Sequence, residues 1–228
     1  MLSRSPSFTN AMPFSSLIGR RGLFLWIREY LEKTNIKGFY IEFGVFNGES
    51  VKEAFYALRN RVTRYIGLDS FCGLPRLDNK IDKCASRLTP AFVEGNFSSK
   101  GYDFVKTNIL STGLNKKDIF LVKGFFRDSL TPKLSSKICG IGNGRAAVIH
   151  LDVDLYSSTI QALEFSYPFM QSGCWLLCDD YWCYTGKSSC GTRKALDDFL
   201  EKHTDIRFQE YCSYSGWAKA FIIEKLEG

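Results

Sequence analysis

The chain has 228 residues, enough for one large domain or two small ones. Its 45% hydrophobic and 24% charged residues are ordinary for a globular protein, and no apolar run reaches the roughly 18 residues that a membrane-spanning helix needs. The formal net charge is +6, but no basic stripe with interleaved aromatic residues accompanies it. We therefore expect neither a nucleic-acid partner nor a membrane partner.

The N-terminal region differs in composition from the rest of the chain. Residues 1–22 are rich in serine, contain no acidic residue and lack the continuous apolar core of a secretory signal. We expect residues 1–37 to form an arm and a helix that lie over one domain, residues 38–228. The eight cysteines are scattered, without a CxxC pair, and several lie in apolar segments, which favours reduced thiols in the cytoplasm. Whether Cys183 and Cys190 interact is left open.

Strand and helix signals alternate along the chain. The expected elements are, in order, strand 39–44, helix 49–60, strand 64–69, an irregular loop 70–98, helix 99–112, strand 119–124, a connection 131–144, strand 146–152, helix 157–171, strand 173–180, helix 191–203, and a hairpin of strands 206–212 and 218–225. Alternating β and α units followed by a hairpin predict an α/β fold of three layers, Rossmann-like, with a mostly parallel seven-stranded sheet, one antiparallel strand and helices on both faces.

The first strand runs through a glycine turn into a helix in the segment IEFGVFNGES. Gly44 and Gly48 allow the backbone to approach a ligand closely, although the segment is not the GxGxxG dinucleotide fingerprint. An acid such as Glu42 at this turn would repel a pyrophosphate, whereas Asp69, at the end of the second strand, can accept both ribose hydroxyls. These acids suit S-adenosylmethionine, which has a sulfonium, an amino group and a ribose. The alternative is that the glycines only form a tight turn.

Four carboxylates end two buried strands: Asp152 and Asp154 follow one, and Asp179 and Asp180 follow the next. The carboxyl ends of parallel strands meet in the crevice where open α/β sheets bind ligands. Negative charge gathered there is costly unless a cation or a proton offsets it. A hard divalent metal bound by oxygen ligands is the simplest answer.

The general base is expected among the same residues. Asp154 is the first candidate, close to Asp152. His150 shares their strand face by alternation, although a histidine inside a strand is more often a buried, hydrogen-bonded core residue. Four aromatic residues beside the acids are candidates for the wall of a sugar pocket, with core packing as the alternative: Tyr156, Tyr181, Trp182 and Tyr184.

Several segments resemble, in family order, the macrocin O-methyltransferase (TylF-type) family of S-adenosylmethionine-dependent enzymes: YIEFGVFNGES, YIGLDSFCGLP, FVEGNFS, LVKGFFRDSL, HLDVDLYSSTIQALE, YPFMQSGCWLLCDDY and GTRKALDDF. The resemblance spans roughly residues 38–200. It implies a class I methyltransferase fold, Mg²⁺, and a hydroxyl acceptor, typically on a sugar of a natural product or glycan. Related enzymes are often oligomers, so a homo-oligomer is possible. The short arm and the CYTGKSSC loop depart from the family pattern, which leaves the acceptor and its methylated position open.

The resemblance also implies roles for individual residues. The cofactor turn comprises Glu42, Gly44, Asn47, Gly48 and Ser50; the ribose position comprises Asp69 and Ser70; loops near the adenine comprise Gly95, Asn96, Lys123, Gly124 and Phe125; the metal positions are Asp152, Asp179 and Asp180. Catalytic roles are expected for Asp154, Asp152 and His150. A divalent cation bound to two vicinal hydroxyls would lower their pKa and orient the attacking oxygen.

Two other functions are compatible with parts of the sequence. Asp152-Val153-Asp154 is the DxD motif of many metal-dependent glycosyltransferases, although a bare DxD is a weak signal. A catalytically inert cofactor-binding relative is the second alternative, against which the complete set of acids argues, because buried carboxylates without a role are destabilising. Binding of S-adenosylmethionine without binding of a UDP-sugar would exclude the glycosyltransferase. Binding without Mg²⁺-dependent turnover on any polyol would favour the inert relative.

Overall fold

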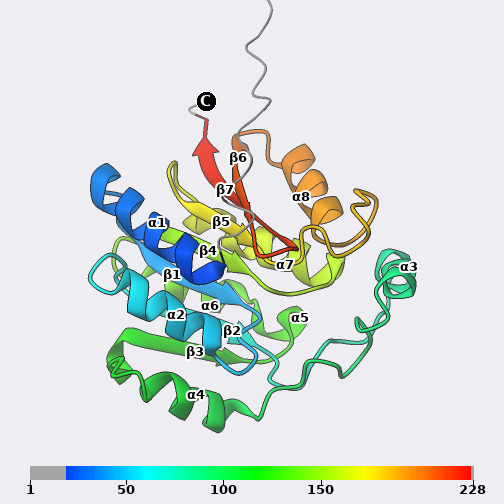
Figure 1. Cartoon of the computed structure of the whole chain (residues 1–228), viewed down its shortest axis with the longest axis horizontal. Helices are drawn as coiled ribbons and strands as arrows, with labels where there is room; N and C mark the ends of the chain where they lie inside the picture. Colours follow the sequence, from blue (N-terminus) through cyan, green and yellow to red (C-terminus); the bar gives the residue numbers. More distant parts are fainter. Residues whose placement is uncertain (1–18, 227–228) are drawn as a thin grey trace, which may run out of the picture.

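Seven strands form one sheet in the computed structural model, which describes residues 19–226 (Figure 1). The strands are β1 (Phe39–Phe43), β2 (Tyr65–Asp69), β3 (Ile119–Lys123), β4 (Ala146–Leu151), β5 (Trp175–Cys178), β6 (Ile206–Tyr214) and β7 (Ala218–Lys225). Their order is β3-β2-β1-β4-β5-β7-β6, and β7 alone runs in the direction opposite to the other six strands. The predicted α/β fold with one antiparallel strand is confirmed.

Helices cover both faces of the sheet (Figure 1). One face carries α1 (Arg20–Thr34), α2 (Glu49–Leu58) and α4 (Tyr102–Leu110); the other carries α5 (Phe126–Ser129), α6 (Pro132–Cys139), α7 (Tyr156–Ser166) and α8 (Gly191–Lys202). Two 3-10 helices, η2 (Lys116–Asp118) and η3 (Tyr167–Phe169), follow α4 and α7. The central strands β1 and β4 are buried along their whole length because helices cover them on both sides.

The chain changes direction across the sheet between β1 and β4. It runs from β1 outward through β2 to β3, returns to β4 beside β1, and then continues to β5. Adjacent parallel strands whose connections leave in opposite directions open a crevice at their carboxyl ends. The glycine turn after β1 and the aspartates after β4 and β5 therefore lie at one edge of the sheet.

Two segments predicted without regular structure contain helices, so those predictions were wrong. Residues 70–98 include α3 (Lys80–Leu88), which lies beyond the main layers in Figure 1 and begins where the Asn79 side chain accepts a hydrogen bond from the Asp82 N–H. Residues 131–144 include α6, where Thr131 caps the first turn and Pro132 occupies the first helical position. These capping signals are local and specific, whereas the prediction relied on the density of glycine, proline and lysine.

Helix α1 is part of the protein core. Leu23, Phe24, Ile27 and Leu31 are buried and pack against the sheet in one cluster with residues of α2, β1 and β4. The arm expected before this helix lies, up to residue 18, outside the described residues. No helix within 19–226 is long and apolar enough to cross a membrane.

Candidate active site

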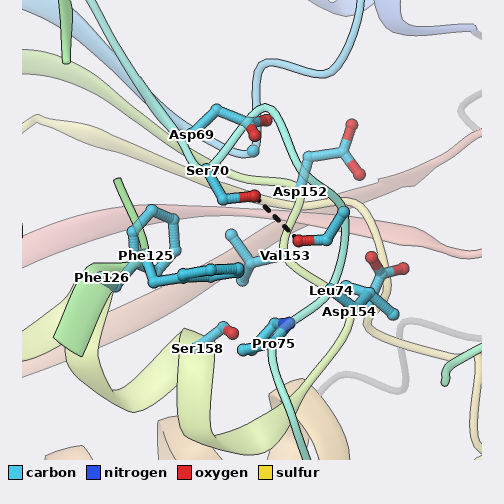
Figure 2. A pocket seen from close by; sticks show the side chains of 12 residues that line it. Asp69, Ser70, Leu74, Pro75, Phe125, Phe126, Asp152, Val153, Asp154 and Ser158 are labelled. Atoms are coloured by element: carbon cyan, nitrogen blue, oxygen red, sulfur yellow. Dashed lines mark hydrogen bonds between the residues drawn. The ribbon is translucent and has the colours of Figure 1, made fainter. Parts of the chain in front are cut away.

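A narrow cavity, here called the inner cavity, opens at the carboxyl ends of β1, β2 and β4. Its volume is about 60 Å³, and it is lined by Gly44, Asp69, Ser70, Gly73, Leu74, Pro75, Phe125, Phe126, Asp152, Val153, Asp154 and Ser158. Figure 2 shows the Phe125 and Phe126 rings on the side opposite the carboxylates of Asp152 and Asp154. The inner cavity shares Leu74, Pro75, Phe125, Phe126 and Ser158 with an outer cavity of about 580 Å³. Together they form a continuous hollow with acids at its inner end.

Gly44 is required by the backbone geometry at this hollow. Its φ is +86°, and a Cβ built on it would lie 1.8 Å from the carbonyl oxygen of Asp152. The glycine turn therefore runs directly against the end of β4. A side chain here would separate the two strand ends that border the cavity.

Replacing Gly44 with Ala should lower the free energy of unfolding by at least about 2 kcal/mol, because backbone strain and a clash with main-chain atoms add together. Gly95→Ala is the matched control, since Gly95 has φ +81° but open space around its Cβ position. That variant should lose only the strain, about 1–2 kcal/mol. Urea denaturation of both variants checks the difference, and equal losses would contradict a steric role for the close approach.

Asp69 joins the loops that follow β1 and β2. Its Oδ2 accepts a hydrogen bond from the Phe46 N–H at 2.8 Å, and its Oδ1 accepts one from the Phe71 N–H at 2.6 Å. Burial raises the pKa of Asp69, while the backbone donors oppose this shift. A carboxylate has about four lone-pair sites, so two bonds to backbone leave acceptor capacity for a ligand in the inner cavity.

The carboxylates after β4 and β5 lie close together and repel one another. Burial, followed by charge repulsion among neighbouring acids, raises the pKa of Asp152 and Asp180 well above the ordinary range. The same two causes raise the pKa of Asp154 to about 8. The Asp152 side chain is 36% exposed to solvent, so water screens part of this repulsion. The cluster still carries more negative charge than its protein partners neutralise.

Asp179 is the exception, because positive groups surround it. Its Oδ1 accepts hydrogen bonds from His150 Nε2 at 2.8 Å and from the Tyr214 hydroxyl, and its Oδ2 lies 3.1 Å from a guanidinium nitrogen of Arg20. Burial alone would raise the pKa of Asp179, but His150 and Arg20 outweigh it and lower that pKa to about 2. Arg20 also contacts Glu53 at 2.9 Å and lies 3.8 Å from Asp152, so α1 supplies a cation to this site.

A buried chain of hydrogen bonds connects Asp179 to the first strand. Tyr40 donates to Glu42 Oε2, and the Tyr40 oxygen lies 2.8 Å from His150 Nδ1. Since the Tyr40 proton goes to Glu42, both nitrogens of His150 act as donors. Burial lowers the pKa of His150, but Asp179 and Glu42 raise it to about 10 overall. His150 is therefore fully buried, its raised pKa favours the protonated form, it orients Asp179, and it lines neither the inner nor the outer cavity.

A third cavity, here called the aromatic cavity, lies beside the inner cavity. Its volume is about 510 Å³, and its lining combines Phe46, Phe92, Phe97 and Trp217 with Asp152, Asp154 and Asp180, in addition to Gly44, Thr89 and Cys183. Gly44, Asp152 and Asp154 line both the inner and the aromatic cavity. Two ligands bound in the two cavities would meet at these three residues.

The residues expected at the cofactor separate into two groups. Gly44, Asp69, Ser70 and Phe125 line the inner cavity, and Gly95 lines the outer cavity. Most of the others form hydrogen bonds with the protein: Glu42 with Tyr40 and Ser50, Asn47 with Lys100 and Asn108, Asn96 with Ala91, and the Gly124 N–H with Asp69. Gly48 packs on Ile109, and Lys123 is exposed at the end of β3. These residues support the turns around the hollow.

Sequence reasoning missed the aromatic cavity. None of the four tyrosines and tryptophans expected to wall a sugar pocket lines it: Tyr156 bonds Asp198, Tyr184 is buried against Phe92, and Tyr181 and Trp182 lie beneath Arg193 and Lys219. Phe46 is adjacent to the glycine turn, Phe97 lies in the family segment FVEGNFS, and Trp217 lies in the terminal hairpin turn, where a pocket role and a packing role were both open. Arg20 carries no local signal. Cys183 and Cys190 are both free thiols, and Cys183 contacts Asp180.

The carboxylates fit a hard divalent cation. Ligand atoms of Asp152, Asp179 and His150 lie within 4.8 Å of one another, and Asp180 lines the aromatic cavity together with Asp152. Both imidazole nitrogens of His150 are engaged, which leaves the carboxylate oxygens as ligands. Mg²⁺ prefers carboxylate oxygens as ligands. A bound cation would also relieve the repulsion among these carboxylates.

Comparison with known proteins relates most of this chain to one family. The family model described as Macrocin-O-methyltransferase (TylF) matches residues 13–207. The 8-demethyl-8-(2,3-dimethoxy-alpha-L-rhamnosyl)-tetracenomycin-C 4'-O-methyltransferase of Streptomyces olivaceus is 29% identical over 149 residues, which cover 64% of this chain and 54% of that protein. The chain thus matches about half the length of this curated relative.

Solved structures share the fold. The O-methyltransferase NovP superposes with a TM-score of 0.70 at 21% identity, covering 91% of this chain and 80% of NovP. CalS11, a calicheamicin methyltransferase, gives 0.67 at 19% identity, covering 97% and 94% of the two chains. An O-methyltransferase from Bacillus cereus in complex with SAH gives 0.54 at 14% identity, covering 90% and 80%. At these identities the likeness establishes a common architecture.

Proposed function

The chain belongs to the macrocin O-methyltransferase (TylF) family, and on that premise we propose that it is an S-adenosylmethionine-dependent O-methyltransferase acting on a hydroxyl of a sugar or glycosylated natural product. The observation that supports this most directly is the junction of two cavities. Gly44, Asp152 and Asp154 line both the inner and the aromatic cavity. A methyl donor in one and a hydroxyl acceptor in the other would have their reacting atoms beside the same carboxylates.

The methyl donor is proposed to bind in the inner and outer cavities. Asp69 would accept hydrogen bonds from the ribose, and Phe125 and Phe126 would flank the adenine. Gly44 lets the backbone approach the methionine part closely. Glu42, Asn47, Gly48 and Ser50 would act by holding this turn, since their polar or backbone contacts go to the protein.

Transfer is an in-line displacement at the sulfonium methyl group. The acceptor oxygen forms a bond to the methyl carbon, the carbon–sulfur bond breaks, and S-adenosylhomocysteine leaves. We assign the acceptor proton to Asp154, whose carboxylate lies at the junction of the cavities and whose pKa is raised to about 8. His150 would keep Asp179 oriented rather than take the proton, because its nitrogens are engaged with Tyr40 and Asp179.

Asp152, Asp179 and Asp180 are proposed to bind Mg²⁺. When bound, the ion would supply Lewis-acid polarisation of the acceptor hydroxyl and fix its position. Arg20 and His150 supply positive charge to Asp179, at 3.1 Å and 2.8 Å from its two oxygens. We further propose that residues 38–228 form the catalytic domain, with α1 as a helix that covers it.

The ribose assignment of Asp69 is testable by binding alone. Asp69→Ala should weaken S-adenosylhomocysteine binding by about 1–3 kcal/mol, the cost of leaving hydrogen-bond partners unpaired. Isothermal titration calorimetry measures this, with Asp103→Ala, an exposed acid on α4, as the control that keeps the original affinity. Denaturation should be measured in parallel because the variant also frees the N–H groups of Phe46 and Phe71. An unchanged dissociation constant would count against this assignment.

The two alternative functions give different binding results. A DxD glycosyltransferase would bind a UDP-sugar and would not bind S-adenosylhomocysteine. An inert relative would bind S-adenosylhomocysteine but transfer no methyl group to any polyol with Mg²⁺ present. Calorimetry followed by a methyl-transfer assay on a sugar panel therefore tests the proposed function against both.

A further inference from the structure

The aromatic cavity contains a second feature besides its acids, namely a rim of large exposed rings. Phe46, Phe97 and Trp217 line the cavity with exposed fractions of 45%, 47% and 62%. They come from the turn after β1, the loop after α3 and the turn between β6 and β7. Three large apolar side chains gathered at one opening indicate a surface that binds an apolar group.

Two of these rings are held by unusual backbone. Phe46 has φ +48° and Phe97 has φ +58°, in the left-handed region that bulky residues rarely adopt. The Phe46 N–H is fixed by Asp69, and the Phe97 ring packs edge-on against buried Phe92 at 5.9 Å. Strained backbone of this kind persists where the surroundings hold it and is concentrated at ligand sites. The fold therefore keeps both rings at the cavity at a cost in conformational energy.

The charge of the cavity restricts what can bind beside these rings. Asp152, Asp154 and Asp180 lie in the lining, and within residues 19–226 no lysine or arginine does. Arg20, which contacts Asp152 from α1, is engaged with Glu53 and Asp179 and is not part of the lining. A ligand that carries a diphosphate would meet three carboxylates with no cationic side chain in the lining to offset them, and a single bound Mg²⁺ would neutralise only part of the combined negative charge.

We propose that Phe46, Phe97 and Trp217 form a subsite for an uncharged, apolar group attached to the acceptor sugar, and that acceptors bearing a nucleotide diphosphate are disfavoured. This rests on the proposed function, because it takes the aromatic cavity as the acceptor site. The sugar would face the carboxylates while its apolar substituent packs on the rings. It follows that methylation comes after the reaction class that transfers the sugar from its activated donor to an apolar carrier.

Binding measurements on the full chain saturated with S-adenosylhomocysteine test this subsite. The probes are the 4-nitrophenyl and methyl glycosides of rhamnose, glucose and fucose, together with dTDP-rhamnose, in buffer with Mg²⁺. At least one 4-nitrophenyl glycoside should bind about tenfold more tightly than its methyl counterpart, and dTDP-rhamnose should bind more weakly than methyl rhamnoside. Trp217→Ala and Phe97→Ala should remove the tenfold preference and leave S-adenosylhomocysteine affinity unchanged.

Phe104→Ala is the matched control, since Phe104 is 45% exposed on α4, outside the cavity lining, and should leave all affinities unchanged. Binding of dTDP-rhamnose as tight as that of the 4-nitrophenyl glycosides would overturn the proposal, and so would the absence of binding by every 4-nitrophenyl glycoside. Loss of the preference in Phe104→Ala would also overturn it. Failure of the wild-type protein to bind S-adenosylhomocysteine would instead refute the proposed function itself.

Discussion

Asp179→Asn should lower kcat for methyl transfer by more than about 100-fold while S-adenosylhomocysteine affinity stays within about twofold. Asp179 accepts hydrogen bonds from His150 and Tyr214 and forms an ion pair with Arg20. One of its carboxylate oxygens lies within 4.8 Å of an oxygen of Asp152. The substitution keeps the side-chain shape but removes the charge that would bind Mg²⁺. Asp179 does not line the inner or outer cavity, so the methyl donor should be unaffected.

Loss of this charge also leaves His150 and Arg20 without their partner, and folding must therefore be checked in the same experiment. Tyr214→Phe is the matched variant, because it removes one hydrogen bond to Asp179 and keeps the carboxylate. Its kcat should fall by less than that of Asp179→Asn. Mn²⁺ binding followed by electron paramagnetic resonance gives a readout independent of turnover. Weakened S-adenosylhomocysteine binding in a folded Asp179→Asn protein would mean that the acid serves the methyl donor.

Asp154→Asn is expected to lower the rate of the chemical step by about 10²–10⁴-fold, the range for a positioned general base. The variant should fold normally, since Asp154 has φ +61° and asparagine tolerates this left-handed conformation better than most residues. The N–H of residue 154, which lies 3.0 Å from Asp180 Oδ2 in the wild-type protein, can still donate this hydrogen bond. The backbone at the junction of the cavities should thus be preserved while proton removal is lost.

Single-turnover rates with a saturating acceptor measure this step directly, and calorimetry with S-adenosylhomocysteine reports the donor site. Asp128→Asn, an exposed acid on α5, provides the matched control and should retain the wild-type rate. An undiminished rate in Asp154→Asn would assign the proton to another group, with Asp152 as the nearest candidate. A large decrease in donor affinity would show that Asp154 acts on the methyl donor instead.

Side-chain directions at the cofactor turn illustrate a limit of reading the sequence. Glu42 lies in the strand position that pairs with His150 of β4, so its carboxylate faces the buried side beneath α1 and α2. There it accepts hydrogen bonds from Tyr40 and Ser50. A motif match identifies the residue, but the direction of its side chain depends on strand pairing and on the helices that cover that face.

The sequence by itself determined the architecture, because alternating apolar runs and helical segments leave few ways to build a sheet. It also indicated that Gly44, Asp69 and the four aspartates after β4 and β5 lie at strand ends, since strand ends are a local property. Tertiary structure alone decided that Arg20 reaches Asp179, that His150 is buried between Tyr40 and Asp179, and that Phe97 and Trp217 join Phe46. Those contacts join segments far apart in the chain, and their positions follow from the packing of whole helices and turns, which no local pattern encodes.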